Sequence, residues 1–337
     1  MIQPPPPDNV VDDIGAAVSI VEATVPPHKP VRADRMYAPA MRYMQWPPAA
    51  RLAPFVRCFW TLESGRGPIE EEVQGEPGAR PGRVFPDGCI EMIFHRGEPF
   101  AAQAADGSFI AQPAAMVVGQ IDRALVLRAP ARALTLGVSF HPAGAWPLLG
   151  APARMLTGRA ADPGDLWGRD GAGLARRVLS AGSAREAAAL IETALLAGLS
   201  RAPSVRPGRR PDAALGWCLT RLAQTRGRTS IGELARATGR SRRALERAFA
   251  EQVGLAPKTF ARIVRFQGVF ERIRSRAGGA LADVALDAGY YDQAHFTREF
   301  RRLTGLCPAS YFPAEHDIAR HFAARVASVQ DAPAAAR

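Results

Sequence analysis

The spacing of apolar residues divides the chain into a strand-like part and a helical part. From Leu52 to Phe140 the apolar runs are short and are bounded by glycine and proline. The run FVRCFWTLE alternates, which predicts a strand with two distinct faces. One face carries Val56, Cys58, Trp60 and Leu62, and the other carries Arg57, Phe59 and Thr61. RVFPDGCIEMIFH predicts two strands around a Pro86–Gly88 turn, and several short strands at this spacing favour a small β-barrel or sandwich.

The pattern becomes helical beyond Trp146. Apolar positions recur at i, i+3 and i+4 over Leu174–Leu179 and Ala187–Leu195, which predicts two amphipathic helices. We interpret residues 151–205 as a helical connector and RAPSVRPGRRP as the linker that follows. The connector helices either carry a dimer contact or pack on the β-rich part without one.

The stretch Thr229–Phe312 contains one unit twice. Shifted by 51 positions, the sequence Leu245–Phe260 aligns with Phe296–Tyr311, so that Phe249 corresponds to Phe300. Upstream the offset is 50, so the second copy has one extra residue just after its glycine. Such a recurrence indicates one supersecondary unit used twice.

Each copy predicts a helix-turn-helix. A short apolar helix ends at Gly239 or Gly289, because glycine adopts the positive φ that such a turn requires. Ser241 or Asp292 then caps a second helix, as short polar side chains do. The second helices, which we take as the recognition helices, span residues 241–250 and 292–303.

Positive charge is concentrated on the repeated part. Residues 201–312 hold 21 Lys and Arg against 9 Asp and Glu, a net charge of 21 − 9 = +12, whereas the whole chain carries +11. This segregation is typical of a nucleic-acid-binding domain, since contacts to phosphates release condensed counterions.

Two runs resemble the helix-turn-helix motifs of AraC-type (AraC/XylS) transcription regulators. IGELARATGRSRRALERAF resembles their first motif, and DVALDAGYYDQAHFTREFRRLTGLCPASYF resembles their second. Departures are Tyr291, Cys307 and Gly268. Upstream, LAPFVRCFW, PDGCIEMIFH, VVGQ and LGVSFHPAGAWPLLG resemble, in this order, a cupin-like domain of many AraC-type regulators.

The resemblance implies an α+β protein whose β-rich sensor precedes an all-α DNA-binding domain. Its implied partners are a double-stranded DNA operator and an unknown small-molecule effector, with RNA polymerase and a second copy of the chain as further partners. A helix from Pro257 to about Ser275 would join the two units and span roughly 27 Å. Since successive major-groove faces lie about 34 Å apart, one chain would read two unlike boxes about one turn apart.

The outward side chains of the repeated units divide into two predicted groups. Base readout is assigned to Ser241, Arg242, Arg243, Arg247, Gln293, His295, Thr297 and Arg298, since arginine can pair with guanine and glutamine with adenine. Phosphate contacts, which position the protein without reading sequence, are assigned to Lys258, Arg262, Arg265, Arg301 and Arg302.

Polar and aromatic residues among the strands are candidates for the effector site. They are Trp60, Glu91, His95 and His141. One alternative is a metal-dependent cupin-type enzyme, but the His-X-His pair of such a site is missing and Glu91 and His95 lie four residues apart on one strand. A second alternative is an interaction module that does not bind DNA, which the basic recognition faces disfavour. We expect no enzyme activity, no metal and no cofactor.

The predicted organisation has five segments. They are a disordered proline-rich segment at 1–40, a cupin-like sensor at 41–150, a helical connector at 151–205, a DNA-binding domain at 212–312 and a flexible tail at 313–337. Met41 or Met44 is a candidate for the native start. The sequence shows no secretory signal and no apolar run of membrane-spanning length, and its four scattered cysteines favour reduced thiols. We therefore expect a cytoplasmic protein.

Overall fold

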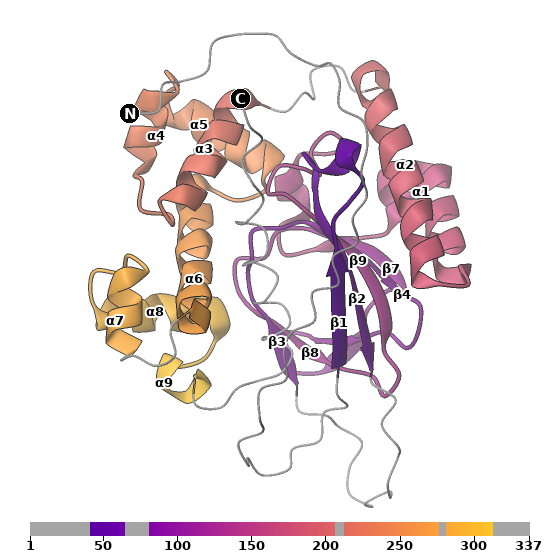
Figure 1. Cartoon of the computed structure of the whole chain (residues 1–337), viewed down its shortest axis with the longest axis horizontal. Coiled ribbons are helices and arrows are strands. Elements are labelled where there is room, and N and C mark those ends of the chain that lie inside the picture. Colours follow the sequence, from indigo (N-terminus) through magenta and orange to yellow (C-terminus); the bar gives the residue numbers. More distant parts are fainter. Residues whose placement is uncertain (1–40, 65–80, 206–211, 276–280, 313–337) are drawn as a thin grey trace, which may run out of the picture.

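The computed structural model describes residues 41–64, 81–205, 212–275 and 281–312. The proline-rich segment and the tail predicted at the two ends lie outside the described residues. A β-sandwich occupies the middle of the molecule, with two long helices on one side and the helix-turn-helix units on the other (Figure 1). None of the described helices is long and apolar enough to cross a membrane.

The sandwich consists of two antiparallel sheets. The larger sheet runs, in spatial order, β1 (Met41–Trp46), β2 (Val56–Ser64), β9 (Leu134–Phe140), β4 (Glu91–His95), β7 (Ala115–Val118) and β10 (Ala160–Ala161). The smaller sheet runs β3 (Gly82–Val84), β8 (Leu125–Arg128), β5 (Ala101–Gln103) and β6 (Phe109–Ala111). Of the two predicted architectures, the structure is therefore an open sandwich and not a closed barrel.

Strand β2 differs from its predicted faces at one end. Its pairing with β9 shifts register between Val56 and Cys58, which is the mark of a bulge. A bulge inserts one extra residue and so reverses the alternation beyond it. Val56 therefore packs with Phe59 on the helix-covered side, whereas Cys58, Trp60 and Leu62 face the smaller sheet. The predicted face was right for these three residues and wrong for Val56.

The predicted turn at Pro86–Gly88 connects two sheets and does not close a hairpin. Strand β3 before it pairs with β8 in the smaller sheet, whereas β4 after it pairs with β7 and β9 in the larger one. Gly88 has φ +81°, and a Cβ there would lie 3.0 Å from the ring of Phe260. The loop therefore passes close against the C-terminal helices.

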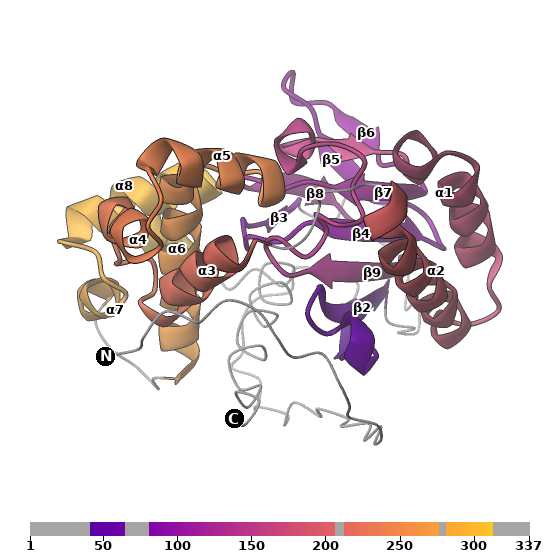
Figure 2. The same cartoon turned by 90° about the horizontal axis from the view of Figure 1, so that it is seen from above.

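Two helices cover the outer face of the larger sheet. They are α1 (Pro163–Ser180) and α2 (Ala184–Val205), which Figure 2 shows on the side opposite the helix-turn-helix units. Val178 and Ile191 are fully buried and share one core with Phe94 and Val138 of the sheet. The connector helices thus belong to the core of the sandwich, whether or not they also contact a partner.

The C-terminal helices follow the predicted order. They are α3 (Ala213–Gln224), α4 (Ile231–Ala237), α5 (Arg242–Gln252), α6 (Pro257–Ser275), α7 (Leu281–Asp287), α8 (Gln293–Thr304) and α9 (Pro308–Tyr311). Helix α6 begins at the predicted proline and has 19 residues. The two units lie at its two ends (Figure 1), with Phe249 and Phe300 fully buried in one common core.

One residue of the sandwich belongs to that helical core. Phe85, which directly follows β3, is 5% exposed and lies 5.7 Å from the ring of Phe266 and 5.5 Å from that of Tyr311. A backbone hydrogen bond reinforces the contact: the amide of Ala124 donates to the carbonyl of Leu303 at 2.7 Å. The β-sandwich and the C-terminal helices are therefore packed together and not merely tethered.

Candidate DNA-binding face and sensor cavity

Both predicted caps of the recognition helices are present. The Ser241 hydroxyl accepts from the amide of Ala244, and the Asp292 carboxylate accepts from that of His295 at 2.6 Å. The turns before them contain Gly239 at φ +65° and Gly289 at φ +93°. Local sequence therefore determines where α5 and α8 begin, and hence which side chains stand at their N-terminal ends.

The two recognition helices expose most of the side chains assigned to DNA. The exposed ones are Ser241, Arg242, Arg243 and Arg247 on α5, Lys258 on α6, and Gln293, Arg298, Arg301 and Arg302 on α8. Among the described residues, none of these cationic side chains forms an ion pair with a carboxylate. Their charges are thus available to a polyanion.

Two predicted phosphate ligands, Arg262 and Arg265, lie on α6 and bind protein groups. Arg262 forms an ion pair with Glu299 of α8 at 3.1 Å, and both side chains are largely buried. Arg265 donates to the carbonyl of Gly227 at 2.8 Å and lies over the ring of Tyr290. Both residues therefore join α6 to neighbouring parts of the units, which favours a structural role over a phosphate contact.

Two predicted base-reading side chains are half-buried. The hydroxyl of Thr297 donates to the carbonyl of Gln293 within α8. The ring of His295 packs edge-on against Tyr290 at 5.3 Å and accepts from the amide of Tyr291. Their readout roles stay predictions, and Arg298 beside them is the more accessible group.

A further ion pair stabilises the first unit and was missed in the sequence. Asp212 caps α3 by accepting from the amides of Ala214 and Leu215, and it also binds both terminal nitrogens of Arg240 at 2.5 and 3.0 Å. This bidentate pair fixes α3 to the turn of the helix-turn-helix. Because the two residues are 28 positions apart in the sequence, no local pattern indicates that they pair.

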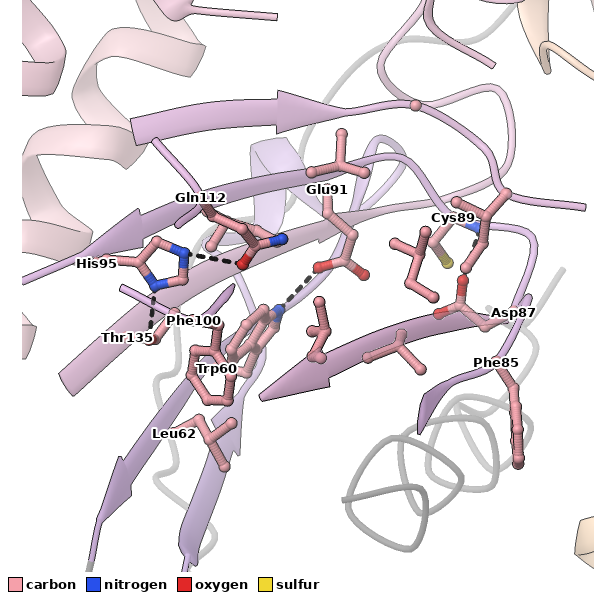
Figure 3. Close-up of a pocket in the computed structure, with 17 residues that line it drawn as sticks. Trp60, Leu62, Phe85, Asp87, Cys89, Glu91, His95, Phe100, Gln112 and Thr135 are labelled. Atoms are coloured by element: carbon pink, nitrogen blue, oxygen red, sulfur yellow. Dashed lines mark hydrogen bonds between the residues drawn. The ribbon is translucent and has the colours of Figure 1, made fainter. Parts of the chain in front are cut away.

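A cavity of about 80 Å³ lies between the two sheets of the sandwich. Its wall contains three of the four predicted effector residues, Trp60, Glu91 and His95 (Figure 3). The other lining residues are Leu62, Val84, Phe85, Asp87, Cys89, Ile93, Phe100, Gln112, Val118, Gly119, Ile121, Leu125, Leu127 and Thr135. The structure thus brings together side chains from β2 and β4. The sequence identified them as separate candidates but did not show that they lie close together.

Glu91 is held by two neutral donors. The Trp60 indole N–H donates to one carboxylate oxygen at 2.9 Å, and the Ser139 hydroxyl donates to the other at 3.0 Å. The indole reaches Glu91 because it crosses Gly137 of β9, where a Cβ would lie only 2.0 Å from the ring. Gly137 is therefore part of the site, since only glycine leaves room for this orientation.

His95 is a buried, neutral histidine. Its two ring nitrogens lie 3.0 Å from the Thr135 hydroxyl and 3.2 Å from the Gln112 side-chain oxygen. Burial lowers the pKa of His95 to about 4, and the bond to Gln112 only partly opposes this shift. At neutral pH the ring is therefore an uncharged, polar end of the cavity.

The fourth candidate, His141, lies in another place. It lines a separate cavity of about 470 Å³ between the sandwich and helices α3 and α6. Burial, and secondarily the charge of Arg57, lowers the pKa of His141. The structure therefore does not bring His141 together with the other three candidates, because β9 ends before it and the chain turns toward the helices.

The described residues contain no group of three or more His, Cys, Asp or Glu side chains that could hold a metal ion. His95 and Glu91 line the same cavity, but each is bound to protein partners of its own. This donor set does not favour the metal-dependent enzyme alternative.

Two parts of the chain match models of known protein domains. Residues 44–162 match the model of a domain of unknown function, DUF6597, and residues 234–314 match the model of a helix-turn-helix domain. A curated relative, an uncharacterised helix-turn-helix-type transcriptional regulator of Haemophilus influenzae, is 31% identical over 90 residues, or 27% of this chain. The matched part spans 30% of the length of that relative.

Solved structures of ToxT from Vibrio cholerae show a remote likeness. The crystal structure of ToxT from strain O395 is 10% identical, with a TM-score of 0.37 over 69% of this chain and 93% of ToxT. Its complex with (E)-4-(8-methylnaphthalen-1-yl)but-3-enoic acid is 9% identical, with a TM-score of 0.40 over 69% and 94% of the two chains. By the two family models, the chain carries a helix-turn-helix domain at residues 234–314 behind a domain of unknown function at residues 44–162.

Proposed function

We propose that this protein is a sequence-specific DNA-binding transcription regulator whose β-sandwich senses a small-molecule effector. Its proposed partners are a double-stranded operator and that effector, and RNA polymerase and a second copy of the chain would be further ones. A regulator of this kind acts in the cytoplasm, and we propose no catalytic activity for it.

The observation that carries this proposal is the pair of basic recognition helices on one connecting helix. Helix α6, with 19 residues, is roughly 28 Å long, which matches the separation of successive major-groove faces to within the width of the units. Arg247 on α5 and Arg298 on α8 are exposed, and arginine is the commonest reader of guanine. The recognition helices differ in sequence, so the operator should contain two unlike boxes about one helical turn apart.

The loop at residues 85–88 is the proposed route from sensor to DNA. Phe85 lines the sandwich cavity and also belongs to the core of the helix-turn-helix units. The next carbonyl, that of Pro86, accepts from the Gln267 side chain of α6 at 2.5 Å. An effector that moves Phe85 must therefore alter the packing of α6, and a ligand with different affinities for the two arrangements shifts their populations.

Selection of fragments from a genomic DNA pool by the full chain tests the DNA-binding function. We expect enriched fragments with two unlike boxes and an affinity that falls on the order of 10³-fold between about 50 and 200 mM salt. Insertion of about 5 base pairs between the boxes should weaken binding, because one recognition helix would then face the wrong side of the duplex. A flat salt response, or selection of no common sequence, would overturn the proposal.

A further inference from the structure

The two helix-turn-helix units differ in the length of the turn before the recognition helix. In the first unit one residue separates Gly239 from the cap Ser241. In the second unit two residues separate Gly289 from the cap Asp292. The turn is where the second copy carries its extra residue, at the N-terminal end of α8.

Backbone hydrogen bonds identify the extra residue as Tyr291. The amide of Arg240 donates to the carbonyl of Ala235. Fifty positions later the amide of Tyr290 donates to the carbonyl of Ala285 in the same way. Arg240 and Tyr290 are therefore equivalent, and Tyr291 has no equivalent in the first unit.

The two neighbouring tyrosines differ in their surroundings. Tyr290 is 4% exposed, and its ring packs edge-on against that of Phe296 at 5.1 Å. Tyr291 is 87% exposed, more than any other large apolar side chain in the part of the chain that the structure describes. Packing within the unit thus accounts for Tyr290, whereas the ring of Tyr291 is presented to whatever the unit binds.

The backbone of Tyr291 is bound to the first turn of α8. Its amide donates to Nδ1 of His295 at 3.4 Å, and the next residue, Asp292, accepts from the amide of His295 at 2.6 Å. The ring therefore stands at the N-terminal end of the helix, close in sequence to the exposed Gln293. A recognition helix contacts base edges with its N-terminal residues, so Tyr291 is placed to reach them.

The first unit offers no such side chain before its cap. The residue there is Arg240, whose guanidinium binds the Asp212 carboxylate of α3 at 2.5 and 3.0 Å. Arg240 is thereby held against the protein. An added contact by the residue before the cap thus concerns the second box alone.

We propose that Tyr291 is a specificity-determining residue that recognises a thymine in the second operator box, with its ring packed on the C5-methyl group of the base. That methyl group distinguishes thymine in the major groove, and it is read by apolar contact. The side chains of Gln293 and Arg298 suit adenine and guanine, so the ring adds a base that these two do not recognise. This proposal rests on the proposed function and deepens it.

Replacement of thymine by uracil tests the contact, because uracil lacks only this methyl group. Each thymine of the second box in the selected operator is replaced in turn by deoxyuridine, and the affinity of the full chain is measured by fluorescence anisotropy at fixed salt. We expect one replacement to weaken binding about fourfold, the value of one buried methyl group. A second box without thymine, or no loss at any of its thymines, overturns the proposal.

Variants of Tyr291 assign that loss to the ring. Tyr291→Ser should weaken binding about tenfold and abolish the difference between thymine and uracil at the one position. Tyr291→Phe should keep the difference, since it keeps the ring. The matched control is Leu286→Ser, which removes another exposed apolar side chain, 52% exposed on α7 of the same unit, and should also keep it. A difference that persists in Tyr291→Ser, or that is lost in Tyr291→Phe, contradicts the contact between ring and methyl group.

The same measurements separate this proposal from the function on which it rests. A chain that selects an operator, while Tyr291→Ser binds it as the unaltered chain does, remains a sequence-specific regulator and loses the proposed thymine contact. In that outcome the exposed ring serves another partner. A chain that selects no common sequence refutes the regulator and the thymine contact together.

Discussion

The ring of Phe85, from the β-sandwich, stacks on the ring of Phe270, in the helix α6 that joins the two helix-turn-helix units, with centroids 5.8 Å apart. Phe85 directly follows a strand of the smaller sheet and also lines the sandwich cavity. One side chain thus contacts both the proposed effector site and the element that sets the spacing of the recognition helices.

Phe85→Ala should destabilise the whole protein and uncouple its halves. Removal of a buried phenyl ring costs about 3–5 kcal/mol of unfolding free energy, and here the lost contacts are those between sensor and helices. Urea denaturation monitored by circular dichroism would measure this loss. The control is Phe109→Ala, since Phe109 is half-buried in β6 under the exposed side chain of Arg128. Equal effects of the two variants would contradict the central position of Phe85.

Arg247→Ala and Arg298→Ala should each relax base preference at one position of the operator. We expect a loss of about 1–3 kcal/mol in binding free energy, because a bidentate contact to one base is removed. Arg128→Ala removes the same charge from the sandwich and serves as the control. Sequencing of DNA selected by each variant measures preference, and unchanged preference in both recognition variants would show that α5 and α8 do not read bases.

Arg262→Ala separates a structural arginine from a phosphate ligand. The Arg262–Glu299 pair is largely buried between α6 and α8, so its loss leaves a carboxylate without its partner and should cost about 2–4 kcal/mol of stability. A phosphate ligand would behave differently, because its loss lowers the salt dependence of DNA binding by about one unit with little change in stability. Denaturation and salt titration of one variant distinguish the two roles.

Local signals in the sequence were sufficient for the DNA-reading half. Pro257 begins the connecting helix, and Ser241 and Asp292 cap the recognition helices, as predicted. Caps, glycine turns and helical periodicity act over a few residues, so they can be read without a fold. The basic residues were harder to assign, since burial of Arg262 and Arg265 depends on how the two units pack.

The β-sandwich depends on contacts between residues far apart in the sequence, which no local pattern indicates. The bulge next to Val56 shifts the register of β2 by one residue, and it places Val56 on the other face. Phe85 meets partners on α6 about 180 positions later, so its role as a contact between domains could not be predicted. His141 was grouped with Glu91 and His95 by residue type alone, and the turn after β9 separates it from them.

Buried His95 should make stability depend on pH in a defined window. Its pKa is lowered from 6.5 to about 4 by burial, so the unfolded chain binds a proton at a pH where the native protein does not. The stabilisation is fully present above about pH 6.5 and is lost as pH falls toward 4, by up to about 3 kcal/mol. His141 has a shift of the same sign. His95→Gln should therefore flatten, but not abolish, the decline of unfolding free energy between pH 7 and 4.5, and an unchanged slope would refute the assignment.

Gly137→Ala should displace the Trp60 indole, which packs over this residue of β9. The added Cβ would lie 2.0 Å from the Trp60 ring, so the indole must move away from Glu91, and overpacking of this kind costs about 1–3 kcal/mol. Gly216→Ala provides the control, because a Cβ there meets nothing within 4 Å and alanine in an exposed helix is favoured by about 0.5–1 kcal/mol. We therefore expect opposite signs in thermal denaturation. A Gly137 variant as stable as the unaltered chain would contradict the close contact between this strand and Trp60.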